Sequence, residues 1–269
     1  MGNHLNVNAH FYVSKLYASP GGITNFSIDL ISALPYLTMD QWTQTLEKAR
    51  GCGAKHISIY DLQIEENTAF GRWYTPGVYP LPPEDTGAEM YKKAVEILST
   101  PCSSTKESFE HYEVSNYAKK GYRSRHNQKY WSCSPVYGFG MAAASYINGE
   151  RFVRPDNMRD YREFIGTKQR NPSDISDNLA SVAPDIYEYI MLALRTSDGI
   201  NLSEFKQLYG MRMYTSLLKS LSAFQHRGKS LYIGTYHHLP TNYISFYAFE
   251  PSVLYINTGF RNIQIRVHL

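Results

Sequence analysis

The most constraining feature of this sequence is a strand–helix–strand pattern over residues 26–62. The run FSIDLI at Phe26–Ile31 is almost entirely apolar, and HISIYDL at His56–Leu62 repeats that character. Between them, residues 38–51 place apolar side chains at helical spacing. Continuous apolar strands are typical of parallel sheets covered by helices. The segment therefore predicts a β–α–β unit of an α/β fold.

The connection between these strands carries a helix-start signal. Thr38 followed by Gln41 matches a capping box, in which two backbone N–H groups are satisfied by side chains. Asp29 lies inside the first apolar run, where a carboxylate is costly unless it is paired or bonds a ligand. Similar patterns predict a strand at residues 111–115 and helices at 84–99, 157–166, 183–195, 202–208 and 214–224.

Composition changes along the chain predict four regions. An irregular lead-in covers 1–22, an α/β domain covers 23–167, a small helical domain covers 168–228, and a β-prone tail covers 229–269. The polar segment after residue 167 marks the main boundary. The three helices of the third region resemble a winged-helix module, and the sequence favours a helical cap packed on the first domain.

The whole-chain properties exclude several classes of protein. A net charge of +3 is too weak to indicate a nucleic-acid partner. No apolar run approaches the roughly 20 residues that span a bilayer, and the first residues match no targeting peptide. Three widely spaced cysteines support neither a disulfide framework nor an all-cysteine metal site. We expect a soluble protein of a reducing compartment, which is the cytoplasm, or a plastid or mitochondrion in a eukaryote.

Ligand-capable side chains are concentrated in residues 111–146. A strand-like segment leads into a predicted basic and aromatic loop, RSRHNQKYW, and then into a small-residue run at Gly138–Ser145 where backbone can approach a ligand closely. His126 in that loop can ligate haem iron or another metal, with Tyr130 and Trp131 offering faces to a flat ring. A surface loop with a satisfied histidine is the alternative on spacing alone, and RNA binding is a weaker one.

Several ordered motifs resemble the HemW-type haem chaperones, in the oxygen-independent coproporphyrinogen III oxidase-like branch of the radical SAM superfamily. They are FSIDLISALPYLT, HISIYDLQIEENTAFGR, HYEVSNYA, SRHNQKYW, YGFGMAAASY and EYIMLALRTSDGINLSEF. The resemblance covers roughly residues 22–210. It implies the C-terminal half of a (β/α) radical-SAM-type barrel, followed by a small helical, winged-helix-like domain.

The resemblance also implies ligands and site residues. The cofactors are haem, S-adenosylmethionine and a [4Fe-4S] cluster. His126 matches the histidine of the HNxxYW motif, implied as a contact to haem iron. The haem set that it implies is His126, Asn127, Tyr130 and Trp131. The S-adenosylmethionine set that it implies is Asp29, Gln63, Gly138, Gly140 and Ala144.

One departure from the family decides the predicted function. The CxxxCxxC motif, which supplies three thiolates to the cluster in this family, is absent, and no cysteine of this chain replaces it. The chain resembles the C-terminal part of a family member and is expected to be N-terminally truncated. We therefore predict a haem-binding, chaperone-like protein, rather than an enzyme, that serves a haem-accepting partner and possesses the capacity to self-associate. The alternatives are a coproporphyrinogen III oxidase-like enzyme and an inactive structural fragment.

Overall fold

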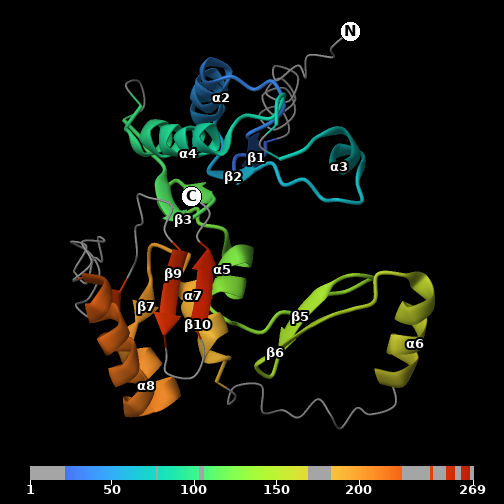
Figure 1. Cartoon of the computed structure of the whole chain (residues 1–269), viewed down its shortest axis with the longest axis vertical. Helices are drawn as coiled ribbons and strands as arrows, with labels where there is room; N and C mark the ends of the chain where they lie inside the picture. The colour runs from blue at the N-terminus through green and yellow to red at the C-terminus, as the bar shows by residue number, and fades with distance from the viewer. Residues whose placement is uncertain are drawn as a thin grey trace. The chain divides into compact units, whose positions relative to one another are not determined.

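The computed structural model describes residues 22–76, 78–102, 106–168 and 183–225, with strand segments at 243–244, 253–257 and 262–266. The chain forms two compact units, one up to Ser124 and the other from Arg125 (Figure 1). Each unit is described by itself. The domain boundary predicted at residues 167–168 stays a prediction, because residues 169–182 lie outside the described part. The predicted lead-in, apart from Gly22, lies outside it too.

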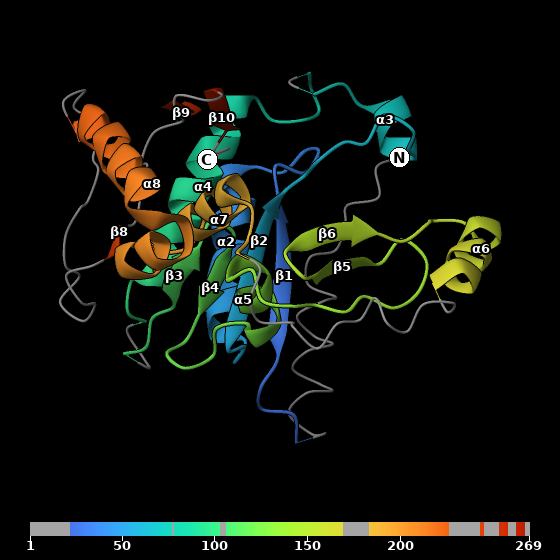
Figure 2. The same cartoon turned by 90° about the horizontal axis from the view of Figure 1, so that it is seen from below.

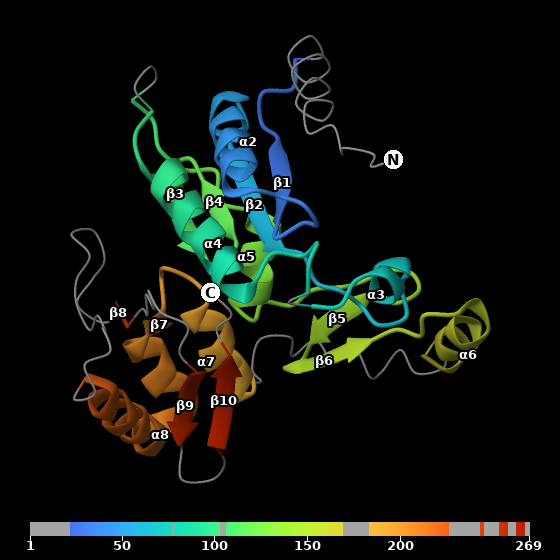
Figure 3. The same ribbon diagram turned by 45° about the horizontal axis from the view of Figure 1, so that its top comes forward.

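The first unit is a four-stranded sheet with helices packed on one face. Its elements are β1 (Ser27–Ser32), α2 (Met39–Gly51), β2 (His56–Asp61), α3 (Ala69–Trp73), α4 (Glu84–Ser99), β3 (Glu110–Glu113) and β4 (Asn116–Ala118). The strand order is β1-β2-β4-β3, and β1 runs parallel to β2, with Ser27 opposite His56 and Ser32 opposite Asp61. Figure 3 shows α2 and α4 side by side against this sheet. The predicted β–α–β unit is therefore present.

The helix between the parallel strands begins as the sequence predicts. The Thr38 side chain accepts a hydrogen bond from the Gln41 backbone at 3.2 Å, and the Gln41 side chain accepts from the Thr38 N–H at 3.0 Å. This reciprocal pair satisfies two of the donors that a helix N-terminus leaves open. Behind it, α2 packs apolar side chains against α4 and the sheet, in a core that includes Trp42, Leu46, Ile57, Met90 and Leu98.

Within the first unit, β1 buries one face and exposes the other, although its sequence is almost entirely apolar. Leu30 and Ser32 point into the core, whereas Ser27, Asp29 and Ile31 are exposed. The alternation follows because side chains along a strand point to opposite faces. Figure 2 shows β1 and β2 running together. One face of β1 is thus open within this unit, and the Asp29 carboxylate does not pay a burial cost there.

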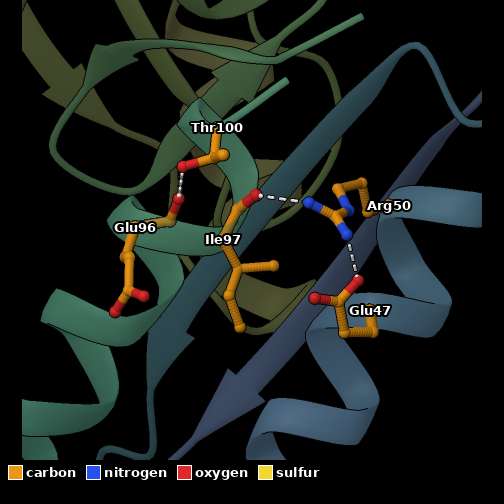
Figure 4. Close-up of polar contacts among 5 residues, drawn as sticks. All are labelled: Glu47, Arg50, Glu96, Ile97 and Thr100. Atoms are coloured by element: carbon orange, nitrogen blue, oxygen red, sulfur yellow. Dashed lines mark hydrogen bonds and ion pairs between the residues drawn. The ribbon is translucent and has the colours of Figure 1, made fainter. Parts of the chain in front are cut away.

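Arg50 joins the ends of α2 and α4. Its Nη1 donates to the Ile97 carbonyl at 3.3 Å, while Nη2 forms an ion pair with Glu47 one turn earlier (Figure 4). At the same end of α4, the Thr100 hydroxyl donates to the Glu96 carbonyl at 2.6 Å. These contacts satisfy carbonyls that the last turn of a helix leaves without intrahelical partners.

The strand predicted at residues 111–115 is instead the first half of a hairpin. β3 ends at Glu113, the chain turns, and β4 returns antiparallel to both β3 and β2. The buried Glu113 carboxylate fixes the turn, because it accepts hydrogen bonds from Ser115 N at 2.9 Å and from the Asn116 amide at 2.6 Å. A short-range carboxylate bond of this kind competes with continued extension of the strand.

The second unit contains two hairpins and a helical core. Its elements are α5 (Arg125–Trp131), β5 (Ala144–Ile147), β6 (Glu150–Val153), α6 (Met158–Lys168), α7 (Ile186–Leu194), β7 (Ile200–Asn201), α8 (Leu202–Gln225), β8 (Tyr243–Ile244), β9 (Val253–Asn257) and β10 (Asn262–Arg266). β5 pairs antiparallel with β6, β7 with β8, and β9 with β10.

The helical core of this unit packs α7 against α8. Tyr189, Ile190, Phe205, Leu217 and Leu221 lie in it and are buried. The helices predicted at 202–208 and 214–224 are joined in α8, with a break at Gly210, whose φ of 78° and ψ of 171° are not helical. Only glycine adopts that backbone conformation without strain, so the break between the two predicted helices is real.

Candidate functional site

The stretch around His126 is a helix, not the predicted loop. α5 covers Arg125–Trp131, and its end is closed by hydrogen bonds from Cys133 N to the Tyr130 carbonyl at 3.2 Å and from Ser134 N to the Lys129 carbonyl at 2.9 Å. Cys133 has a φ of 51°, the left-handed conformation that commonly ends a helix. The sequence did not indicate this helix, because seven residues are too few to show apolar side chains repeating at helical spacing.

The helical form brings His126 and Tyr130 onto one face. Residues four apart are neighbours on a helix, and the two rings meet edge to face with centroids 5.0 Å apart. His126 is exposed, and no described residue hydrogen bonds either of its ring nitrogens. Both nitrogens are therefore available to a ligand.

The other two residues of the predicted haem set, Asn127 and Trp131, make contacts within the protein. Trp131 packs against the small buried cluster of Cys133, Tyr146 and Leu192, which holds the C-terminal end of α5 to the rest of its unit. Asn127 is half-buried and already has a partner within the protein. Of the four predicted residues, the structure thus presents His126 and Tyr130 together.

The residues predicted to contact S-adenosylmethionine fall in both units. In the first unit, Asp29 projects from the open face of β1, and the exposed Gln63 follows the carboxyl end of β2. The backbone runs on to this point through a hydrogen bond from Leu62 N to the Ser32 carbonyl at 3.1 Å. Ligands of parallel sheets bind beyond the carboxyl ends of the strands, which is where Gln63 lies.

In the second unit, Gly138, Gly140 and Ala144 lie in and beside one tight loop. A Cβ on Gly138 would stand 2.2 Å from the Ala144 carbonyl oxygen, so two stretches of backbone touch there. Gly140 has a φ of 96° and donates its N–H to the Tyr161 hydroxyl at 3.2 Å. In this small-residue run the backbone approaches the chain itself closely, and the predicted approach to a ligand stays a prediction.

The described residues do not fit an iron–sulfur cluster. Among them, no group of three His, Cys, Asp or Glu side chains could hold a metal ion, and none of the three cysteines forms a disulfide. Burial raises the pKa of the Cys133 thiol to about 11 and also raises the pKa of Cys52. Metal ligation needs the thiolate, so burial disfavours the form that would bind iron.

A hydrogen-bonded chain centred on the buried His56 and Tyr112, which the sequence did not indicate, leads to the residue before α5. Ser27 Oγ lies 2.8 Å from His56 Nδ1, His56 Nε2 lies 2.7 Å from the Tyr112 hydroxyl, and Ser124 N donates to that hydroxyl at 3.0 Å. All four groups are satisfied when Tyr112 donates to Nε2 and Nδ1–H donates to Ser27. Burial lowers the pKa of His56, which keeps its ring neutral, and raises the pKa of Tyr112 to about 12. Partners separated by up to 56 residues leave no signal in the sequence.

The fold of the chain is similar to that of one solved protein. No family model matches the chain. A solved structure, titled "Coproporphyrinogen III oxidase (HemN) from Escherichia coli is a Radical SAM enzyme", superposes with a TM-score of 0.62 at 13% identity. The superposition covers 90% of this chain and 55% of that chain, so it shows the likeness of fold.

Sequence similarity narrows this class to HemW-like proteins. The chain is 36% identical over 205 residues to the "Heme chaperone HemW" of Synechocystis and 32% identical over 206 residues to that of Lactococcus lactis. These matches cover 76% and 77% of this chain, and 48% and 51% of the two relatives. A bovine relative, "Radical S-adenosyl methionine domain-containing protein 1, mitochondrial", is 29% identical over 194 residues.

The predicted resemblance is therefore confirmed. The chain resembles the HemW proteins over about three quarters of its length, and its fold is similar to that of the coproporphyrinogen III oxidase structure. It spans about half the length of the HemW relatives that it matches. In the described part of the chain, no helix is both long and apolar enough to cross a membrane.

Proposed function

We propose that this chain binds haem through the face of α5 that carries His126 and Tyr130, and that it acts as a haem chaperone. The observation that carries the proposal is the exposed His126 ring, whose nitrogens no described residue engages. A histidine satisfied by the protein, which the sequence alone also allowed, would show such a bond. Haem iron accepts an imidazole as an axial ligand.

The chemistry of the neighbouring residues supports this assignment. Tyr130 lies edge-on to His126 and is half-buried, so it limits the orientations of the imidazole ring while leaving the nitrogens accessible. A ring held in one orientation loses less entropy when it takes a ligand. Trp131 supports the same helix from the buried side. The resemblance to proteins named haem chaperones agrees with this reading.

The test is a haem titration of the full chain, followed by the Soret absorbance. Residues that merely orient a metal ligand cost about 10- to 100-fold in affinity when removed, so His126→Ala is expected to weaken binding by at least about tenfold. Tyr130→Phe, which keeps the ring, is expected to bind as the unmodified protein does. Equal haem affinity in His126→Ala would remove His126 from the site.

A matched control addresses adventitious ligation by other histidines. His237 and His238 are adjacent in the sequence and lie outside the described residues. The double variant His237→Ala/His238→Ala removes two imidazoles without touching α5 and is expected to leave haem affinity unchanged. A loss in this variant equal to that in His126→Ala would indicate unspecific binding.

We further propose that Asp29 and Gln63 contact S-adenosylmethionine on the open face of the first unit. Asp29 is exposed, and no described residue bonds its carboxylate, which leaves it free to accept hydrogen bonds from hydroxyl or amino groups of a ligand. Isothermal titration of Asp29→Asn should show at least about tenfold weaker binding of S-adenosylmethionine, because hydrogen bonds to charged groups contribute about 1.5–3 kcal/mol. Asp40→Asn, an exposed carboxylate on α2, is the control. Unchanged binding in Asp29→Asn would contradict the assignment.

The partner that follows from this function is a haem-accepting protein. The proposed compartment is a reducing one, where cysteines such as these three stay as thiols. Relatives include bacterial proteins and mitochondrial ones, so the cytoplasm, or an organelle in a eukaryote, is the proposed location. Mixing the haem-loaded chain with an apo-haemoprotein and following the Soret band of the acceptor tests the transfer.

A further inference from the structure

Arg154, which follows β6, is a cation without a carboxylate partner among the described residues. Its Nη1 donates to the buried Ser145 hydroxyl at 2.6 Å, and no described residue accepts from its other guanidinium nitrogens. The carboxylate two residues on, Asp156, instead lies 3.4 Å from the Asn157 amide. Arg151, on the neighbouring β6 strand, shows the usual alternative, since it pairs with Glu188 at 2.6 Å.

Arg154 is nevertheless held in a fixed position. Its guanidinium carbon lies 5.6 Å from the centre of the Phe152 ring and 5.9 Å from that of Phe164, so two aromatic faces support it. Its backbone N–H donates to the Ala143 carbonyl at 3.0 Å. A charged group that is held in place but unpaired in the protein is suited to an anionic ligand, because the cost of ordering the side chain is already met.

The same contacts connect Arg154 with the loop that contains Gly138 and Gly140. Ser145 Oγ accepts hydrogen bonds from Arg154 Nη1 and also from Gly138 N at 3.0 Å, so the guanidinium and the loop meet at one oxygen. The glycines alternate with apolar side chains that point to solvent: Tyr137 is 48% exposed, Phe139 86% and Met141 44%. A fixed cation thus lies beside an exposed apolar surface.

We propose that Arg154 and this loop form a binding subsite for a propionate of a porphyrin, whose apolar ring lies on Tyr137, Phe139 and Met141. The inference rests on the proposed haem-binding function and adds to it a second contact, to carboxylate rather than to iron. Guanidinium groups match carboxylates geometrically and bind them through paired hydrogen bonds. A porphyrin is an apolar disc with carboxylates at its edge, so its ring matches the exposed apolar side chains and its carboxylate matches the charge of Arg154.

Metal-free protoporphyrin IX separates this inference from the role of His126, because it has no iron for the imidazole to bind. Fluorescence titration of the full chain is expected to show about tenfold weaker binding in Arg154→Gln. Arg154→Lys, which keeps the charge but loses the planar fork, is expected to fall between the two. Arg159→Gln, an exposed arginine on α6, removes the same charge nearby and is expected to bind normally.

The dimethyl ester of protoporphyrin IX identifies the group that Arg154 contacts. Its propionates are blocked, so it is expected to bind the unmodified protein and Arg154→Gln equally. If Arg154→Gln and the unmodified protein bind protoporphyrin IX equally, or if the unmodified protein does not bind it, the inference is overturned. Loss of S-adenosylmethionine binding in Arg154→Gln with unchanged porphyrin binding would also overturn it. An unaffected His126→Ala variant in the haem titration would refute the proposed iron contact and leave these outcomes intact.

Discussion

Replacing Tyr112 with phenylalanine isolates the contribution of the hydrogen-bonded chain centred on His56 and Tyr112. The Tyr112 ring is only 1% exposed and packs edge-on to His56, so phenylalanine keeps the packing and removes only the hydroxyl. That hydroxyl contacts His56 Nε2 at 2.7 Å and Ser124 N at 3.0 Å. The substitution therefore removes the hydrogen bonds that this hydroxyl makes with His56 and Ser124.

The expected cost follows from those two bonds. A neutral hydrogen bond contributes about 1 kcal/mol net, and a buried polar group left without a partner costs about 1–3 kcal/mol. We expect Tyr112→Phe to lower the free energy of unfolding by about 2 kcal/mol. That corresponds to roughly a 30-fold change in the folding equilibrium, at about 1.4 kcal/mol per factor of ten.

Two measurements check this expectation. Urea denaturation gives the free energy of unfolding, and amide hydrogen exchange at Ser124 reports the local bond, which should lose protection in Tyr112→Phe. Tyr122→Phe is the matched control, because Tyr122 is 41% exposed and its hydroxyl has no described partner; surface changes of that kind stay within about 0.5 kcal/mol. The reasoning is refuted if Tyr112→Phe is as stable as Tyr122→Phe and Ser124 remains protected.

Three further predictions concern the first unit. Burial lowers the pKa of His56 and His111 in the folded state, so the unfolded chain binds more protons. The free energy of unfolding should therefore be highest above about pH 6.5 and should fall as the pH drops toward the lowered pKa values. Urea denaturation from pH 7.5 to 5 measures it, and a flat profile would contradict this expectation. Arg50→Met keeps the aliphatic stem but loses the hydrogen bond to the Ile97 carbonyl, so we expect the free energy of unfolding to fall by about 1 kcal/mol. An unchanged free energy of unfolding would show that this contact does not stabilise the fold. Thr38→Ala removes half of the capping box and is expected to cost about 1 kcal/mol, measured by thermal unfolding, whereas Thr38→Ser should retain most of that stability.

Local chemistry made much of the fold predictable. The capping box of Thr38 and Gln41, the parallel pair of strands and most of the longer helices follow from local sequence patterns, and the structure contains them, whereas the short helices α3 and α5 were not predicted. The hairpin at Glu113 was missed because its turn depends on one carboxylate that accepts hydrogen bonds from the Ser115 backbone N–H and the Asn116 side-chain amide. The apolar strand pattern gives no sign of these bonds. The open face of β1 was missed because coverage by helices depends on the rest of the fold.

The candidate site was predictable only where family motifs carried it. The HNxxYW stretch indicated His126 as a candidate, but the sequence indicated neither the helix nor which of its residues face solvent, since both depend on the packing of Trp131. Arg154 was missed because an arginine near a strand end looks like any solvated charge. Its fixed position, with no carboxylate partner among the described residues, becomes visible only when Ser145, Phe152 and Phe164 are seen around it.

The contact at Gly138 has a consequence for how this sequence can vary. Every other amino acid adds a Cβ, which would stand 2.2 Å from the Ala144 carbonyl oxygen, so every missense codon at this position is expected to be depleted when a library of variants is selected for folded protein. Gly87 and Gly166 have open space where a Cβ would go, and codons for alanine should persist there. The frequencies of the surviving DNA sequences at these three positions would therefore report whether the backbone contact at Gly138 exists.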